Sequence, residues 1–258
     1  MAVTIKSEHE IELMRVACRN LYEMFGEMEK MIRPGVSTWE INQRGEEIIR
    51  DFGCTSNFKN YEGYPAAVCV SVNEVVVHGI PSKDVILKEG DIVSLDAGMI
   101  WKGWHSDAAR TYAVGRISPE KQQLIDVTRQ SFFEGIRYAR AGNHLHDISA
   151  AIQKYAESFG YGVIRDMVGH GIGSHMHEDP QIPNYRSPGM GRGIVLRPGM
   201  TLAIEPMIAM GTYKGEILDD GWTYVTKDRK PAAHYENTVL ITDGDPEILT
   251  LPGWKPEN

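Results

Sequence analysis

Two kinds of hydrophobic pattern divide the chain into helices and strands. Four segments carry apolar residues three or four positions apart, which predicts an amphipathic helix in each. Short apolar runs between them are typical of β-strands. We expect helices at 8–31, 37–52, 118–139 and 144–159, and strands near 66–72, 74–78, 163–168, 201–208 and 236–241.

The ends of these helices carry residues that favour helix boundaries. Ser37 is followed three positions later by Glu40, which is a capping-box pattern. Ser118 precedes Pro119, and proline is favoured at the first helical position. Gly160 follows the fourth helical segment, where a glycine commonly ends a helix.

A β-hairpin is expected between the second and third helices. One apolar run ends at Asp96, and a second begins soon after Asp107. If the chain turns at Trp101 and Lys102, the two aspartates are cross-strand neighbours on one face, with Cβ atoms ~5 Å apart. Such carboxylates repel unless a proton or a cation lies between them. The alternative interpretation is a pair of hydrated hairpin aspartates.

The order of elements repeats along the chain. Residues 33–35 resemble 140–142, and residues 87–96 resemble 196–205 at nearly the same offset. Each half then has the order helix, helix, strands, with repeats of about 1–117 and 118–250. We expect an α+β fold with a curved, mainly antiparallel sheet, helix pairs on its outer face and internal pseudo-two-fold symmetry.

Composition limits the class of protein and its partners. The 258 residues are 42% hydrophobic and 24% charged, which is typical of a soluble globular protein, and we expect residues 1–258 to form a single domain. The net charge of −8 disfavours a specific nucleic-acid or membrane partner. No signal peptide or transmembrane run is expected. A cytoplasmic location with reduced thiols is expected for the three cysteines, Cys18, Cys54 and Cys69.

Acidic residues within apolar strands suggest a metal centre. Asp96, Asp107, Glu205 and Glu236 have strand contexts, and four converging carboxylates cannot all ionise without a cation. His170 lies in a glycine-rich stretch. Four carboxylates and one imidazole are a donor set that suits two divalent ions (Co, Mn, Fe or Zn). Such an oxygen-rich set argues against a zinc site built from thiolates. Two such ions can lower the pKa of a water between them, which suits hydrolysis.

Seven motifs resemble those of a known family. They are VVHGIP at 76–81, SLDAG at 94–98, SDAART at 106–111, GHGIG at 169–173, MHEDP at 176–180, AIEP at 203–206 and YENT at 235–238. In this order they resemble type I methionine aminopeptidases, over about residues 7–249. The resemblance implies the pita-bread fold. It also implies removal of the N-terminal methionine from nascent proteins and peptides whose second residue is small.

The resemblance also implies a role for each site residue. Glu205 would act as general base, and His78 and His177 would contact the substrate near its amide and its scissile carbonyl. Phe58 and Met176 replace residues that are common in relatives, which leaves the depth of the pocket open. The implied metal ligands are Asp96, Asp107, His170, Glu205 and Glu236, with Asp107 and Glu236 bridging. The implied wall of the methionine pocket is Tyr61, Tyr64, Cys69, Met176 and Trp222.

Other readings of the same motifs remain open on the sequence alone. Aminopeptidase P and prolidase share the fold and the metals, but they usually carry an N-terminal domain. A non-enzymatic binding protein of this fold would lack ligands that are present here. The expected partners are peptide and nascent-chain N-termini, with the ribosome as a candidate for a further contact, and we expect a monomer. The physiological metal stays undetermined.

Overall fold

The predicted helices are all present in the computed structural model, which describes residues 3–256. Ser37 accepts a hydrogen bond from the Glu40 backbone N–H while the Glu40 carboxylate accepts from the Ser37 N–H, so the capping box is confirmed. None of the helices within 3–256 is both long and apolar enough to cross a membrane. The helices are α1 (Glu8–Glu29), α2 (Thr38–Asp51), α3 (Pro119–Ile136) and α4 (Leu145–Ser158).

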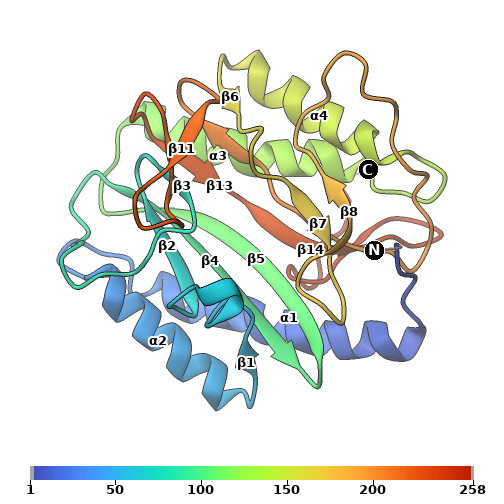
Figure 1. Ribbon diagram of the computed structural model, residues 1–258, viewed down its shortest axis with the longest axis horizontal. Helices are drawn as coiled ribbons and strands as arrows, with labels where there is room; N and C mark the ends of the chain where they lie inside the picture. The colour runs from blue at the N-terminus through green and yellow to red at the C-terminus, as the bar shows by residue number, and fades with distance from the viewer. Residues whose placement is uncertain (1–2, 257–258) are drawn as a thin grey trace.

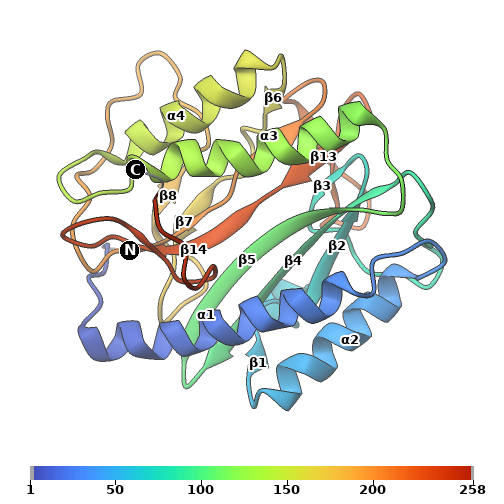
Figure 2. The ribbon, with the colours of Figure 1, turned by 180° about the vertical axis from the view of Figure 1, so that it is seen from behind.

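A curved sheet and the helices form two layers. Helix α1 lies behind β4 and β5 in Figure 1 and in front of them in Figure 2, which shows the outer face of the sheet. The main sheet has the order β1-β4-β5-β14-β9-β7-β8, with β2 added to β4 and β15 to β14. Its strands are β1 (Thr55–Ser56), β2 (Val68–Val72), β4 (Ile92–Trp101), β5 (Trp104–Ala113), β7 (Gly169–Gly171), β8 (Glu178–Ile182), β9 (Thr201–Ile204), β14 (Glu236–Leu240) and β15 (Glu247–Ile248).

Two small sheets and a short helical turn flank the main sheet. One small sheet has the order β13-β10-β6 and the other β11-β12-β3. Every strand pair in the described residues is antiparallel. The remaining elements are β3 (Val75–Val77), η1 (Tyr61–Gly63), β6 (Gly162–Val163), β10 (Met207–Ala209), β11 (Gly215–Ile217), β12 (Tyr224–Thr226) and β13 (Ala232–His234).

Alternation along the strands separates the core from the site. Leu95 and Ala97 of β4 pack with the apolar faces of α1 and α2, in the cluster that holds Leu21 and Ile48. Successive side chains of a strand point to opposite faces of the sheet. Asp96, which lies between Leu95 and Ala97, therefore points away from the helices, toward the inner face of the curved sheet.

Each half of the chain contains a corresponding backbone hydrogen bond between its two repeated segments. The Gly35 N–H donates to the Leu87 carbonyl (2.8 Å), and the Gly142 N–H donates to the Leu196 carbonyl (3.0 Å). These pairs are the matching positions of the two sequence repeats. The correspondence agrees with the pita-bread symmetry, and the repeat boundaries near residue 117 stay a prediction.

The predicted hairpin exists, but its register differs from the prediction. Asp96 of β4 pairs with Ala109 of β5, so Asp107 lies two residues away along the partner strand. The turn is formed by Lys102 (φ 49°) and Gly103 (φ 83°), one residue later than expected. Positive φ at both central residues is what a two-residue hairpin turn of the favoured twist requires. Direct opposition of the two aspartates was therefore wrong, although they share a face.

The predicted strand at 201–208 is interrupted. Strand β9 stops before Glu205, and β10 starts after Pro206. Proline has no N–H to continue the ladder. The Glu205 carbonyl instead accepts a hydrogen bond from the Asn184 side-chain amide (2.9 Å). The break leaves Glu205 at a strand end rather than in the middle of a strand.

The predicted strand at 163–168 is also shorter than expected, because only Val163 and its preceding glycine belong to β6. The side chains of Arg165 and Asp166 are held by tertiary contacts. The Arg165 guanidinium lies 4.1 Å from the centre of the Tyr213 ring, and Asp166 accepts a hydrogen bond from the Tyr224 hydroxyl (2.6 Å). These contacts stabilise a loop where the apolar pattern alone indicated a strand.

Candidate metal centre and substrate pocket

One cavity of about 190 Å³ brings together every residue that the sequence indicated for the site. Its acidic end is formed mainly by strands of the main sheet and its apolar end mainly by loops. Phe58 and Glu62 also line it. The complete lining is Phe58, Tyr61, Glu62, Tyr64, Cys69, His78, Asp96, Asp107, His170, Met176, His177, Glu205, Trp222 and Glu236.

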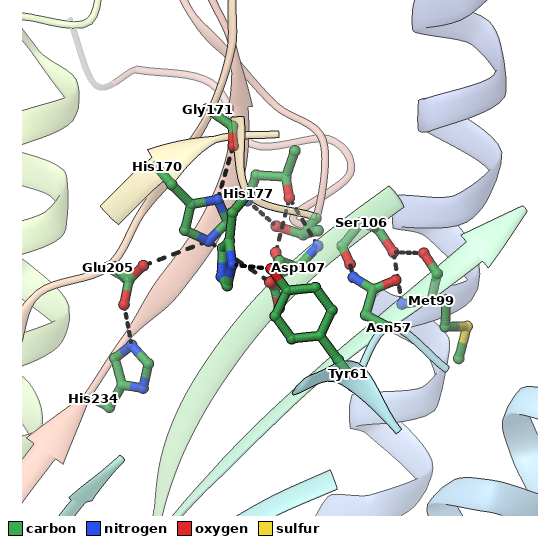
Figure 3. A network of polar contacts seen from close by, with 12 residues as sticks. Asn57, Tyr61, Met99, Ser106, Asp107, His170, Gly171, His177, Glu205 and His234 are labelled. Carbon is green, nitrogen blue, oxygen red and sulfur yellow. Dashed lines mark hydrogen bonds and ion pairs between the residues drawn. The ribbon is translucent and has the colours of Figure 1, made fainter. Parts of the chain in front are cut away.

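The acidic end is assembled from neighbouring strands. The order β4-β5-β14-β9 places Asp96, Asp107, Glu236 and Glu205 on adjacent positions of the sheet, and His170 comes from β7 beside β9. Donor atoms of Asp107, His170 and Glu236 all lie within 4.8 Å of one another. His170 Nε2 lies 3.9 Å from Asp107 Oδ2 and 3.7 Å from Glu205 Oε1 (Figure 3).

Burial controls the charge of this end. It raises the pKa of Asp96 to about 7. It also raises the pKa values of Asp107 and Glu236 well above their ordinary range, and the neighbouring carboxylates raise both further. The pKa of Glu205 is raised by burial as well. Without a cation the group would therefore retain protons at neutral pH, and a bound cation would replace them.

The donor set fits divalent metal ions. Asp96 Oδ1, Asp107 Oδ1 and Glu236 Oε1 are buried and have no hydrogen-bond partner within the described chain. Nδ1 of His170 lies 2.8 Å from the Gly171 carbonyl, so Nδ1 carries the proton and Nε2 is free to bind a metal. Burial lowers the pKa of His170 to about 3, which keeps this imidazole neutral, as a ligand must be.

The other end of the cavity is apolar. Tyr64 and Trp222 meet edge to face, with ring centres 5.2 Å apart. The two residues that depart from common family positions, Phe58 and Met176, both lie in this wall and keep it apolar. The wall cluster is formed by Phe58, Tyr64, Ala66, Cys69 and Met176, with Tyr61, Ile80 and Trp222 packed against it.

Two neutral histidines lie between the acidic and apolar ends. Nδ1 of His177 is 2.8 Å from the Tyr61 hydroxyl, and its ring centre is 4.4 Å from that of His170 (Figure 3). His78 follows β3 with φ 59°, a conformation that is uncommon outside glycine. Burial lowers the pKa of His78 to about 4 and also lowers that of His177, so both can donate a hydrogen bond at neutral pH.

Sequence reasoning missed His234. This buried residue of β13 places Nε2 3.6 Å from Glu205 Oε2 (Figure 3), and neither ring nitrogen has a hydrogen-bond partner among residues 3–256. Burial lowers its pKa to about 4. The available signal was its position two residues before Glu236, because alternate residues of an extended segment share a face.

A protein-family model and several known proteins match this chain. Residues 12–243 match the model of metallopeptidase family M24. The chain belongs to this family. It is 53% identical over 249 residues to a methionine aminopeptidase of Clostridium acetobutylicum, covering 96% of this chain and 99% of that protein. The methionine aminopeptidase of Escherichia coli is 42% identical, with 97% and 95% covered.

Solved structures agree with the family assignment. The crystal structure of methionine aminopeptidase from Thermotoga maritima has a TM-score of 0.94 at 46% identity and covers 96% of this M24 chain and 99% of its own. An Xaa-Pro dipeptidase from Bacillus anthracis has a TM-score of 0.78 at 26% identity, and the match covers 63% of that chain. The pita-bread fold and the resemblance to type I methionine aminopeptidases are confirmed, and the M24 family supports the use of divalent metal.

Proposed function

We propose that this M24 peptidase removes the N-terminal methionine from nascent proteins and peptides whose second residue is small, using two divalent ions (Co, Mn, Fe or Zn). The observation that carries the proposal is the cavity itself. An oxygen-rich donor set with one imidazole lies at one end, and an apolar pocket walled by aromatic and sulfur side chains lies at the other.

The acidic end would hold the metal. Asp107 and Glu236, on the adjacent strands β5 and β14, would hold metal from the middle of the set. Asp96, His170 and Glu205 would complete the two coordination shells. When bound, the ions supply Lewis acidity, which lowers the pKa of a water and offsets charge that develops on the substrate.

Three side chains would handle protons and charge. Glu205 would accept the proton of the attacking water as general base. His177 would donate from Nε2 to the scissile carbonyl oxygen, and in that tautomer its Nδ1, 2.8 Å from the Tyr61 hydroxyl, would accept the hydrogen bond of that hydroxyl. His78, on the same cavity wall as Trp222, would hold the substrate near its amide.

The two ends of the cavity together would give the specificity. A free α-amino group must reach the acidic end while the first side chain enters the apolar end, so only the first peptide bond is presented. Sulfur and aromatic groups such as Cys69, Met176 and Tyr64 suit a thioether. The second side chain must pass between His78 and His177, which favours a small residue.

The wider setting is part of the same proposal. We propose that residues 1–258 form one catalytic domain that works as a monomer in the cytoplasm, with the ribosome as a candidate contact. The three cysteines are buried and form no disulfide in the described chain, which suits a reducing compartment.

The proposal is tested with anaerobically purified enzyme on the peptides Met-X-Ser. We expect two metal ions per chain by elemental analysis, and faster cleavage for X = Gly, Ala or Ser than for X = Leu or Lys. Leu-Ala-Ser is the control for the first position. Equal rates for X = Gly and X = Leu, or faster cleavage of Leu-Ala-Ser than of Met-Ala-Ser, would overturn the assignment.

A further inference from the structure

The cavity lining carries one carboxylate more than the proposed metal ligands supply. Its lining contains five carboxylates and, within the described chain, neither lysine nor arginine. Two divalent ions would offset the four buried carboxylates. The fifth carboxylate, that of Glu62, lies outside the proposed ligand set.

Glu62 stands in a rigid turn at the edge of the cavity. It is the middle residue of η1 and has φ 49°. The Asn60 N–H donates to the Tyr64 carbonyl (2.8 Å), and the Tyr64 N–H donates to the Tyr61 carbonyl (2.9 Å), which fixes the backbone on both sides. The turn therefore holds the Glu62 side chain at the rim, although a left-handed conformation is uncommon for a residue with a Cβ.

Nothing in residues 3–256 neutralises this carboxylate. Glu62 is solvent-exposed and has no hydrogen bond or ion pair to the described chain. The nearest cation in sequence, Lys59, is paired with Glu46 at 2.7 Å. Glu62 nevertheless lines the same cavity as His78 and His177.

We propose that Glu62 is a specificity determinant that favours a cationic residue, and disfavours an acidic one, at the third position of the substrate. The inference rests on the proposed aminopeptidase function. In that function the first side chain fills the apolar pocket and the second must be small. The third residue is then the first that can bring a charge to the rim where Glu62 lies.

The size of the effect follows from solvent exposure. Two unit charges about 4 Å apart in water interact by about 1 kcal/mol, which corresponds to about fivefold in binding. Salt screens exposed charges, with a Debye length of about 10 Å at 0.1 M and about 3 Å at 1 M. We therefore expect a preference of about fivefold for each unit of charge at low salt, and its loss in concentrated salt.

The experiment compares three C-terminally amidated peptides, Met-Ala-Lys, Met-Ala-Gln and Met-Ala-Glu, on the metal-replete full chain. Wild type should show kcat/KM in the order Lys, Gln, Glu at 20 mM salt, carried by KM because Glu62 does not touch the reacting bond. Glu62→Gln should give three similar values, and Glu62→Lys should reverse the order. The matched control is Glu23→Gln, which makes the same change in net charge on the exposed side of α1.

The outcomes separate this inference from the function on which it rests. Cleavage of the Gln peptide without a charge order, or an order that survives in Glu62→Gln, overturns the role of Glu62 and leaves the aminopeptidase assignment standing. An order that Glu23→Gln abolishes equally would assign the effect to net charge and also overturn it. If wild type cleaves none of the peptides, the proposed function fails, and the specificity with it.

Discussion

The two ends of the cavity are built in different ways. Asp96, Asp107 and Glu236 stand on strands that pair on both sides in the main sheet. Most of the apolar wall comes from three loops, around Tyr61, Met176 and Trp222, and Cys69 of β2 completes it. Metal ligands need fixed geometry, and a ladder of backbone hydrogen bonds supplies it. A wall made of loops can change its shape without disturbing the ligands, so affinity for metal and choice of substrate are structurally separable.

Individual side chains hold the loops of the wall in place. Lys6 Nζ forms a buried ion pair with Glu178 Oε2 (2.6 Å), and Thr4 Oγ1 donates to the same oxygen (2.6 Å). Glu178 Oε1 accepts the His175 N–H at 3.2 Å. This contact braces the turn that carries Met176. A segment near the N-terminus thus positions one side of the pocket.

The loop of Trp222 has a comparable brace. Asp220 accepts hydrogen bonds from the Trp222 and Thr223 N–H groups, each at 2.8 Å, and from the Thr223 hydroxyl at 2.6 Å. These bonds hold the Asp220 pKa below its ordinary value, although partial burial works against the shift. One carboxylate therefore fixes the turn that presents the indole to the cavity.

The largest effect is expected at the sheet end. Asp107→Ala removes the central ligand, so metal content and turnover should both be lost. Asp84→Ala, on an exposed loop, is the control that should retain both. Elemental analysis and cleavage of Met-Ala-Ser measure the two quantities, and an Asp107→Ala protein with full metal and full activity would refute the proposed site.

At the loop end, Lys6→Met should destabilise the protein by about 3–5 kcal/mol, because it leaves the Glu178 carboxylate buried without its cation. The double variant Lys6→Met with Glu178→Leu should recover much of this stability, since an apolar pair can replace a buried ion pair. Urea denaturation measures both. If the Lys6–Glu178 ion pair positions the wall, the stabilised double variant should bind metal normally. It should nevertheless discriminate less well than wild type between Met and Leu at the first position of the substrate.

His177 lies where the two ends meet. His177→Ala should bind metal normally but lose on the order of 10²–10³ in kcat, the usual cost of removing one group that stabilises a developing oxyanion. Tyr61→Phe, which removes only the hydroxyl that orients the imidazole, should have a smaller effect. A metal-replete His177→Ala enzyme with a near-normal kcat would exclude this role.

Met176 tests the wall without touching the metal. Met176→Ala enlarges the apolar pocket, so the preference for methionine over leucine at the first position should fall by about 1–3 kcal/mol, or roughly 5- to 160-fold. Metal content should not change. Unaltered selectivity in this variant would place the Met176 side chain outside the substrate pocket.

The same contrast explains how far the sequence could be read. The expected hairpin predicted that Asp96 and Asp107 share a face, because directly opposed residues point to the same side of a sheet, and the actual shift of two residues along β5 keeps them on one face. The position of the turn was missed by one residue, because Lys102 adopts a positive φ that the pattern of apolar residues does not encode. His234 was missed for a different reason. Its contact with Glu205 joins β13 to the end of β9, and no local pattern reports such a long-range contact.

The smallest effect concerns the pH dependence of stability in the metal-free protein. The folded pKa of Asp96 is about 7, and those of Asp107, Glu205 and Glu236 are also raised, whereas an unfolded carboxyl titrates near pH 4. From about pH 4 up to these folded pKa values the folded state therefore binds protons that the unfolded chain has released. Stability must fall as pH rises through this window, by about 1.4 kcal/mol per pH unit for each proton retained, and levels off above the folded pKa values.

The buried histidines act in the opposite direction and offset part of the carboxyl slope between about pH 4 and 6.5. Burial lowers the pKa of His78 to about 4 and that of His234 to about 4, so the unfolded chain binds the extra protons between about pH 4 and 6.5. Denaturation in EDTA should thus show stability falling as pH rises above about 6.5, where the histidines no longer offset the carboxyls, and added metal should remove that slope while releasing protons. Calorimetry in two buffers of different ionisation enthalpy counts the protons. A slope that is the same with and without metal would mean that the strand carboxylates are not the groups that retain protons, and the sheet end would not be the metal site.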